Sequence, residues 1–507
     1  MRKKQSLSKK LFFGIIYLFS SSIITIGIKV VTIAYIARRL GVEQFGLYSA
    51  LIAFIGLFQF ISDFGLNKTL LKYGSKNLHQ ASISFGNALF AKSILILPLL
   101  ICVGISGYFA GYKNDTYLSL ILFATSMIFD SYAHVFSSIR RITGSFKLIS
   151  FFRIVKTLVT LAVYVYVLYV YNSVFVLALA TLLLTMFMFV VSLINTVMLL
   201  KPRLKLSILK DFFQDSILFS LNDLFINIYA RIGIVILSFF NELFVVGVYS
   251  AALRFTKIAI LLPRQIRFAM LPTMYRLLDD KSSIEEKIEP IDPEVDDVAI
   301  SSEALIEGDL KKSKKVFNLM LKYMSFFSTP VAILIFYFSE SIIHLIFGSK
   351  YDSSIPFVQL FTVFIFFRFI ETPFGLYYLG LNRHKDLIIL QGIASAINIL
   401  LCFLLIPSLA GFGAAMSTNI SEIIFVVLVL LFGIQFKIWD VVGSLSRICL
   451  PFIVGLVSLF ITVKTCGSVN IIVQLFVFAL SYLCLLIVSR QFGKEDTLFF
   501  KKVFLKK

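Results

Sequence analysis

The chain has 507 residues, of which 59% are hydrophobic and 15% are charged, and its mean hydropathy is +0.92. A soluble domain is roughly 45–50% apolar and about 25% charged, so this composition excludes an ordinary soluble protein and indicates an integral membrane protein. The formal net charge of +20 does not indicate nucleic-acid binding, because that function needs a basic face on a soluble domain.

Fourteen apolar segments follow one another along the chain, and each is long enough for a bilayer core that needs about 20 residues per helix. They predict an all-α, polytopic membrane protein. The first segment has no small-residue cleavage site before "ARRLG", so we expect a permanent helix and not a signal peptide. The predicted spans are 11–36, 44–66, 83–109, 117–139, 149–171, 174–200, 212–240, 244–263, 316–338, 355–380, 386–406, 411–434, 446–464 and 468–489.

The basic residues are distributed unevenly between the two sides of the membrane. If the N-terminus is cytoplasmic, most Lys and Arg residues outside the spans fall in inner segments and few fall in outer loops. By the positive-inside rule this predicts an even number of spans and two cytoplasmic termini. We therefore expect a multi-pass protein of the cell (cytoplasmic) membrane.

The sequence motif of one predicted turn occurs twice in the chain. Gly46, Tyr48, Ser49, Ala50 and Phe54 recur as Gly247, Tyr249, Ser250, Ala251 and Phe255, an offset of 201 residues, and "LFS" at 18–20 recurs at 218–220. The two copies are six spans apart, which is an even number, so both halves of the chain would have the same orientation in the membrane, as in transporters built from parallel repeats. We expect a six-helix N-terminal lobe over 1–210, a six-helix C-terminal lobe over 211–434, and an extra helix pair with a basic tail over 435–507.

The only long polar stretch is 279–315, which contains 12 of the 28 acidic residues and two prolines. With so few large apolar residues, this stretch cannot bury enough surface to fold on its own. We expect a flexible cytoplasmic linker here, with a regulatory or docking role as the alternative.

The sequence has no nucleotide, zinc-peptidase or serine-elbow motif, and its outer loops are short. We therefore predict no enzyme, no metal site and no cofactor. The five cysteines lie in or at the ends of apolar spans without C-x-x-C spacing, which predicts packing residues and not a disulfide framework.

Several longer stretches resemble a known family. They are "IARRLGVEQFGLYSALIAFIGLFQFISDFGLNK", "YSAALRF", "LLPRQIRFAMLPTMYRL", "HLIFGSKYDSSIPFVQLF" and "NILLCFLLIPSLAGFGAAMSTNISE". Together, and in order along nearly the whole chain, they resemble the oligosaccharide flippase (Wzx-type polysaccharide transporter) family of the multidrug/oligosaccharidyl-lipid/polysaccharide (MOP) exporter superfamily.

The resemblance implies two lobes around a central cavity, alternating access, and a polyprenyl-diphosphate-linked oligosaccharide as cargo. The cargo would move from the cytoplasmic to the outer leaflet for cell-surface polysaccharide biosynthesis. It also implies coupling to a proton or cation, and it leaves contact with polysaccharide-assembly proteins open.

Charged residues inside the spans are the candidate site residues, since each costs about 2.5–3.5 kcal/mol at a helix centre and therefore faces a cavity or a partner. An anionic diphosphate needs fixed cations, and Arg offers a bidentate fork. The candidates for cargo binding are Arg254, Arg231, Lys29, Lys92 and Lys257, and those for ion coupling are Asp223, Glu422 and Asp130.

Each of these charges has a structural alternative. Arg368 with Glu371 and Arg231 with Asp223 have the spacing of ion pairs within one helix. Arg153, Lys156 and Lys322 lie near inner span ends, where snorkelling to the headgroups is the expected behaviour.

Two rival functions remain open. An ion-coupled antiporter for drugs or organic cations is the alternative within the superfamily, and it would need a net acidic cavity, whereas cations outnumber acids among the central groups. A membrane-embedded glycosyltransferase or ligase would need an extramembrane catalytic domain that the sequence does not provide.

Overall fold

The structure is a computed structural model that describes residues 2–240, 242–267, 270, 274, 296–381, 383–434, 441–466 and 470–489. Every regular element in these ranges is helical. This follows from the apolar composition, because a chain in a bilayer has to satisfy each backbone N–H and C=O internally.

The chain forms two compact units. Unit 1 comprises 1–251, 343–353 and 399–414, and unit 2 comprises 252–342, 354–398 and 415–507. These units follow contacts, whereas the lobes predicted at 1–210 and 211–434 follow the sequence repeat. The two divisions do not coincide, and the lobe boundaries stay a prediction.

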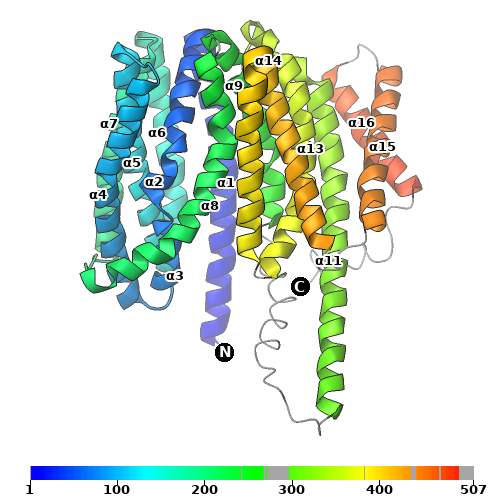
Figure 1. Cartoon of the computed structure of the whole chain (residues 1–507), viewed down its shortest axis with the longest axis horizontal. Helices are drawn as coiled ribbons and strands as arrows, with labels where there is room; N and C mark the ends of the chain where they lie inside the picture. Colours follow the sequence, from blue (N-terminus) through cyan, green and yellow to red (C-terminus); the bar gives the residue numbers. More distant parts are fainter. Residues whose placement is uncertain are drawn as a thin grey trace. The chain divides into compact units, whose positions relative to one another are not determined.

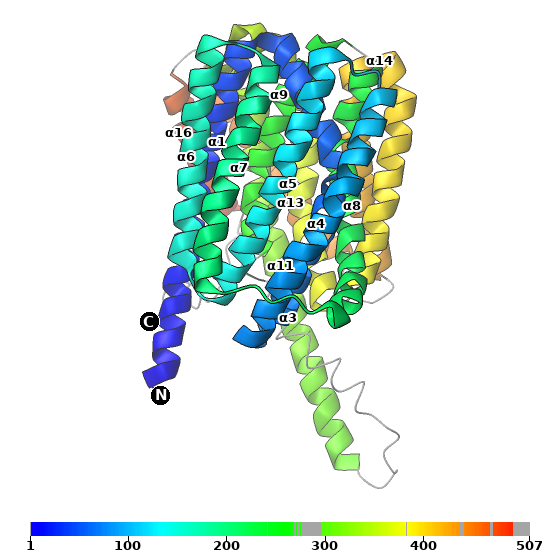
Figure 2. The ribbon, with the colours of Figure 1, turned by 90° about the vertical axis from the view of Figure 1, so that its left-hand side faces the viewer.

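Among the described residues, unit 1 contains nine whole helices and parts of four others. The whole helices are α1 (Arg2–Leu57), α2 (Gln59–Asp63), α3 (Leu66–Gly74), α4 (Leu78–Phe109), α5 (Asn114–Ile142), α6 (Phe146–Val170), α7 (Val174–Leu199), the 3-10 helix η1 (Leu206–Ile208) and α8 (Leu209–Phe240). The parts are the start of α9 (Leu243–Ala259), the end of α12 (Ser339–Ile346), most of the 3-10 helix η2 (Ser349–Ser354) and the middle of α14 (His384–Ile434). Helices α6, α7, α5 and α4 lie side by side in that order (Figure 2), and α1 packs against α6 and α8.

Unit 2 contains the end of α9, α11 (Asp296–Tyr337), the start of α12 (Ser339–Ile346), α13 (Ile355–Gly380), both ends of α14 (His384–Ile434), α15 (Val441–Cys466) and α16 (Ile471–Val488). Helix α11 packs against α13 and α15. The predicted extra helix pair, α15 and α16, shares a buried cluster with α11 that consists of Phe326, Val454, Tyr482 and Leu486. The Tyr482 hydroxyl donates to the Phe326 carbonyl, 3.1 Å away.

Within the described ranges, twelve helical segments are long and apolar enough to cross a membrane. Two of them are long enough for two crossings, and each contains a non-helical residue, Gly41 (φ 76°) in α1 and Ala410 (φ 48°) in α14. These residues fall where the sequence predicts the turns between spans 1 and 2 and between spans 11 and 12. Each predicted span therefore contains helix among its described residues.

The second predicted span, 44–66, is not one continuous helix. It is interrupted at Phe58, and Phe64 and Gly65 adopt left-handed conformations with φ of 43° and 68°. The chain therefore passes from α1 through the short α2 to α3. A broken helix leaves carbonyls without intrahelical donors, and neighbouring helices have to supply them.

The repeated turn brings its two copies together. A Cβ on Gly46 would meet the backbone carbonyl of Leu243, and a Cβ on Gly247 would meet that of Val42. Because 42 and 243, like 46 and 247, differ by the repeat offset of 201, the two contacts are reciprocal. A two-fold relationship between the two turns produces this pattern.

Residues 343–353 belong to unit 1 although the residues before and after them belong to unit 2. Arg38 of α1 donates to the carbonyls of Leu345 (2.6 Å) and Ile346 (3.0 Å) at the end of α12. The Tyr351 hydroxyl donates to the Ala37 carbonyl at 2.9 Å. These bonds satisfy the carbonyls that the end of α12 leaves free and hold the segment against α1.

The prediction of a flexible linker over 279–315 is wrong for its second half. Residues 279–295 lie outside the described ranges, but residues from Asp296 onward form the first part of α11, which extends past the end of α15 (Figure 1). Adding residues to an existing helix gains a hydrogen bond for each residue fixed, so even this polar segment can continue a membrane helix.

Candidate functional site

A polar cavity of about 520 Å³ lies within unit 1, among α1, α5, α6 and α7. Five basic side chains and one carboxylate line it, and the rest of the lining is mainly Thr, Ser and aromatic residues. The charged residues are Lys29, Asp130, Arg140, Arg141, Arg153 and Lys156. The cavity is therefore strongly cationic.

Helical spacing explains why these side chains meet. The lining residues of α5 include Asp130, His134, Ser137 and Arg141, those of α6 Arg153, Lys156, Thr160 and Tyr164, and those of α7 Thr181, Thr185, Met188 and Ser192. Steps of three and four residues place each set on one helix face. Polar stripes on otherwise apolar helices face one another because turning them toward lipid would cost several kcal/mol for each unsatisfied group.

Arg140 is the most buried cation of the cavity. Its side chain is 3% exposed, and its Nη2 donates to the carbonyl (3.1 Å) and hydroxyl (2.9 Å) of Ser192. Its guanidinium lies 4.0 Å from the centre of the Phe152 ring. Among the described residues its Nε has no hydrogen-bond partner and no carboxylate forms an ion pair with it. An anion in the cavity would compensate this buried charge.

The remaining charges of the cavity surround Asp130. Lys156 forms an ion pair with Asp130, and the electrostatic neighbours of Lys29 are Lys156, Asp130 and Arg153. Arg153 donates to the Ser22 hydroxyl at 2.7 Å. Snorkelling was the expectation for Arg153 and Lys156, but both line the cavity. The three-and-four spacing of polar residues in α5 and α6 is the sequence signal that identifies them.

Two predicted cargo-binding cations lie at the break in the second span. Lys92 is 2% exposed, forms a 2.9 Å ion pair with Asp63, donates to the Ser62 carbonyl at 3.2 Å and contacts Ser131. It lies outside the cationic cavity. These bonds favour a structural role for Lys92, and its role in cargo binding stays a prediction.

Arg231 caps the end of α1 in the same region. It donates to the Gly56 carbonyl at 2.7 Å and to the Gln59 side chain at 2.8 Å, and it contacts Asn227. Arg231 is therefore not paired with Asp223, which forms a 2.7 Å ion pair with Lys68 of α3 instead. The expectation of an Arg231–Asp223 pair within α8 is wrong, because groups on neighbouring helices lie closer.

The acids of unit 2 also pair between helices. Glu371 accepts 2.8 Å hydrogen bonds from Arg267 at both carboxylate oxygens, and Arg368 donates to Glu422 at 3.1 Å. The predicted Arg368–Glu371 pair within one helix is therefore wrong. Glu422, a candidate for ion coupling, is fully buried against Arg368.

Of the predicted site residues, the cavity thus contains Lys29 and Asp130. Arg254 and Lys257 lie on α9 and are not among the residues that line it. Both take part in interactions of their own, so their roles stay predictions.

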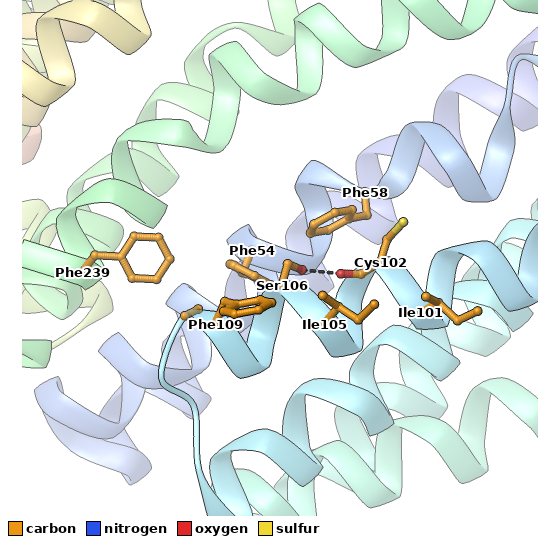
Figure 3. Close-up of a pocket in the computed structure, with 9 residues that line it drawn as sticks. Phe54, Phe58, Ile101, Cys102, Ile105, Ser106, Phe109 and Phe239 are labelled. Carbon is orange, nitrogen blue, oxygen red and sulfur yellow. Dashed lines mark hydrogen bonds between the residues drawn. The ribbon is translucent and has the colours of Figure 1, made fainter.

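A second pocket of unit 1 is apolar. It has a volume of about 680 Å³ and lies among α1, α4 and α8. Phe54, Phe58, Phe109 and Phe239 surround it together with Ile101 and Ile105 (Figure 3). Among the described residues that line it, Ser106 carries the one hydroxyl group, which donates back to the Cys102 carbonyl of its own helix at 2.5 Å. This pocket offers no group that could orient a polar ligand.

Comparison with known proteins places these features in context. Residues 11–278 and residues 288–356 each match a family described as polysaccharide biosynthesis protein. No curated protein sequence matches the chain.

Among solved structures, the lipid II flippase MurJ in an inward closed conformation is 17% identical. Its TM-score is 0.74, and the match covers 95% of this chain and 99% of that one. The MATE multidrug transporter DinF-BH is 16% identical with a TM-score of 0.56 and coverages of 85% and 94%. A MOP superfamily transporter from Pyrococcus furiosus, for which a binding pocket of reverse polarity suggests a different function, is 14% identical with a TM-score of 0.55 and coverages of 84% and 95%. The likeness establishes the fold, that of MOP superfamily transporters.

Proposed function

Since the chain belongs to the polysaccharide biosynthesis protein family, we propose that it flips a lipid-diphosphate-linked oligosaccharide across the cell membrane by alternating access. The cargo would move from the cytoplasmic to the outer leaflet during synthesis of a cell-surface polysaccharide. The family and the fold are those of transporters and flippases, and the proposal adds the class of cargo and the direction.

The observation that carries the proposal is the charge of the cavity in unit 1, where five cations stand against one carboxylate. A diphosphate is the most strongly charged part of the proposed cargo. Arg guanidinium groups bind phosphate oxygens through two parallel hydrogen bonds, and the lower effective dielectric constant of a cavity inside a protein strengthens this attraction relative to bulk water. We infer that Lys29, Arg140, Arg141, Arg153 and Lys156 hold the diphosphate.

The same charge argues against the organic-cation antiporter. A cationic drug would meet net repulsion in this cavity, since like-charge juxtaposition disfavours binding. The transporter from Pyrococcus furiosus is described as having a pocket of reverse polarity, so the sign of the pocket differs between proteins of this fold.

The positions of the basic groups support the proposed direction. Arg140 and Arg141 are at the end of α5, and Arg153 is near the start of α6. Under the positive-inside rule this end of the helices is cytoplasmic, as are both termini. The cavity would therefore take its cargo from the cytoplasmic leaflet.

Flipping by the purified full chain in liposomes tests the proposal. The probe is a fluorescent lipid-diphosphate oligosaccharide, and its protection from a membrane-impermeant quencher measures transfer. We expect transfer by the wild type and at least a tenfold loss in Arg153→Gln with Lys29→Gln. Lys113→Gln, outside the cavity, is the matched control. A dye cation transported in place of the lipid would support the antiporter and reject the proposal.

A further inference from the structure

We propose that Asp130 is a built-in competitor of the cargo, an inference that rests on the proposed function for the identity of that cargo. The Asp130 carboxylate holds the Lys156 ammonium, and a phosphate group that binds in the cavity has to take its place. Asp130 would thereby limit how tightly the anion is held and so favour its release.

The geometry makes such an exchange feasible. The pair joins α5 to α6 across the cavity, and the side chains of Asp130 and Lys156 are 47% and 31% exposed. Both line the cavity, so a ligand can reach both groups. A partly exposed ion pair is weak compared with a fully buried one, so breaking it costs little.

The surroundings favour a phosphate over the carboxylate. Lys29 is an electrostatic neighbour of both members of this pair. Arg153 and Arg140 line the same cavity, and Arg140 has no carboxylate partner among the described residues. A diphosphate carries more charge and more acceptor oxygens than one carboxylate and can engage several of these donors at once. Asp130 satisfies only one of them.

Competition predicts an affinity change opposite to that of a binding residue. If Asp130 competes for Lys156, Asp130→Asn should bind inorganic diphosphate about three- to tenfold more tightly, the size expected for one charge in a partly hydrated site. Lys156→Gln should bind it more weakly. In the double variant most of the gain from Asp130→Asn should disappear, because the group for which Asp130 competes is gone.

Isothermal titration of the purified full chain with inorganic diphosphate measures these affinities, with gel filtration to show that each variant is folded. Asp115→Asn, on the same helix but outside the cavity, is the control and should bind like the wild type. Unchanged or weaker binding by Asp130→Asn would overturn the inference. An equal gain in the presence and absence of Lys156 would do so too, since Asp130 would then act only as a nearby charge.

The flipping assay separates this inference from the proposed function. A wild type that flips the lipid probe and binds diphosphate, with no effect of Asp130→Asn, rejects the competitor and leaves the flippase. A wild type that neither flips the lipid nor binds diphosphate rejects both.

Discussion

Gly46 of α1 and Gly247 of α9 lie backbone against backbone, so that a Cβ on Gly46 would come 3.0 Å from the Gly247 nitrogen. Real Cβ atoms are not found closer than this, and the atoms in the way are main-chain atoms that no rotamer change can move. Small residues allow such close approach between membrane helices. The sequence motif of this turn occurs twice, each time with its glycine. In the structure the missing side chain of each glycine allows the two backbones to approach closely.

Gly46→Ala and Gly247→Ala should each destabilise the protein by about 1–3 kcal/mol, because an added methyl group forces the helices apart. Gly27→Ala is the matched control, since it also lies in α1 and a Cβ there would meet nothing within 4 Å. Replacing a helical Gly where there is space should stabilise by up to about 1 kcal/mol. Thermal unfolding of the purified proteins compares the three, and equal effects would contradict the close approach.

Lys92→Met should lower the amount of folded protein, since it leaves Asp63 inside the span without its ion-pair partner. Removing one member of a buried pair costs about 3–5 kcal/mol. The second change, Asp63→Asn, should recover part of the loss. Gel filtration of the tagged protein from solubilised membranes measures the folded amount. Normal amounts of Lys92→Met with loss of glycan export would instead support cargo binding by Lys92.

Arg254 lies near the middle of the apolar segment Leu243–Arg267, and we expect it to contact the diphosphate during transport. Arg254→Ala should reduce glycan export at least tenfold with the folded amount unchanged, and Arg254→Lys should keep part of the activity because only the bidentate fork is lost. Surface glycan and protein amount are measured in the same cells. Normal export by Arg254→Ala would remove this residue from the cargo path.

Asp215 of α8 should make stability depend on pH. The sequence predicts a span over 212–240, but the apolar segment of this helix starts only at Asp223, so Asp215 lies before it. Hydrogen bonds from Lys72 and Tyr73 lower the pKa of its carboxyl group. A lowered pKa means that the pair adds stability above the unfolded-state value of about 3.9 and loses it as the pH falls through the folded-state value. The partial exposure of both side chains limits the contribution to about 1 kcal/mol.

Asp215→Asn should therefore unfold at a lower temperature than the wild type at pH 7, and the difference should shrink as the pH falls below the unfolded-state value of about 3.9 and disappear once the folded-state carboxyl is protonated. The same pair raises the pKa of Lys72, so its contribution should stay constant up to about pH 10. Glu43→Gln, at an exposed position of α1, should show no such dependence. A difference that persists in acid would mean that Asp215 stabilises α8 by other contacts.

The apolar pattern alone identifies a membrane protein and its spans. The length of a hydrophobic run is a local property of the sequence, and it determines directly whether the segment can span a bilayer. Glycines are informative in the same way. Gly41 lies in a predicted turn and has a positive φ, a conformation that Gly adopts without a Cβ penalty. Both features follow from residues that are adjacent in the chain.

The partners of the charged residues could not be read from the sequence. Glu371 pairs with Arg267 and not with Arg368, and Lys92 supports a helix break that the continuous apolar run of span 2 conceals. Spacing along a helix tells which residues share a face, but not which neighbouring helix that face meets. The rotation and tilt of packed helices decide this, and they depend on side-chain packing over the whole bundle. The cationic cavity arises in the same way, from polar stripes on α5, α6 and α7 that only the packed structure brings together.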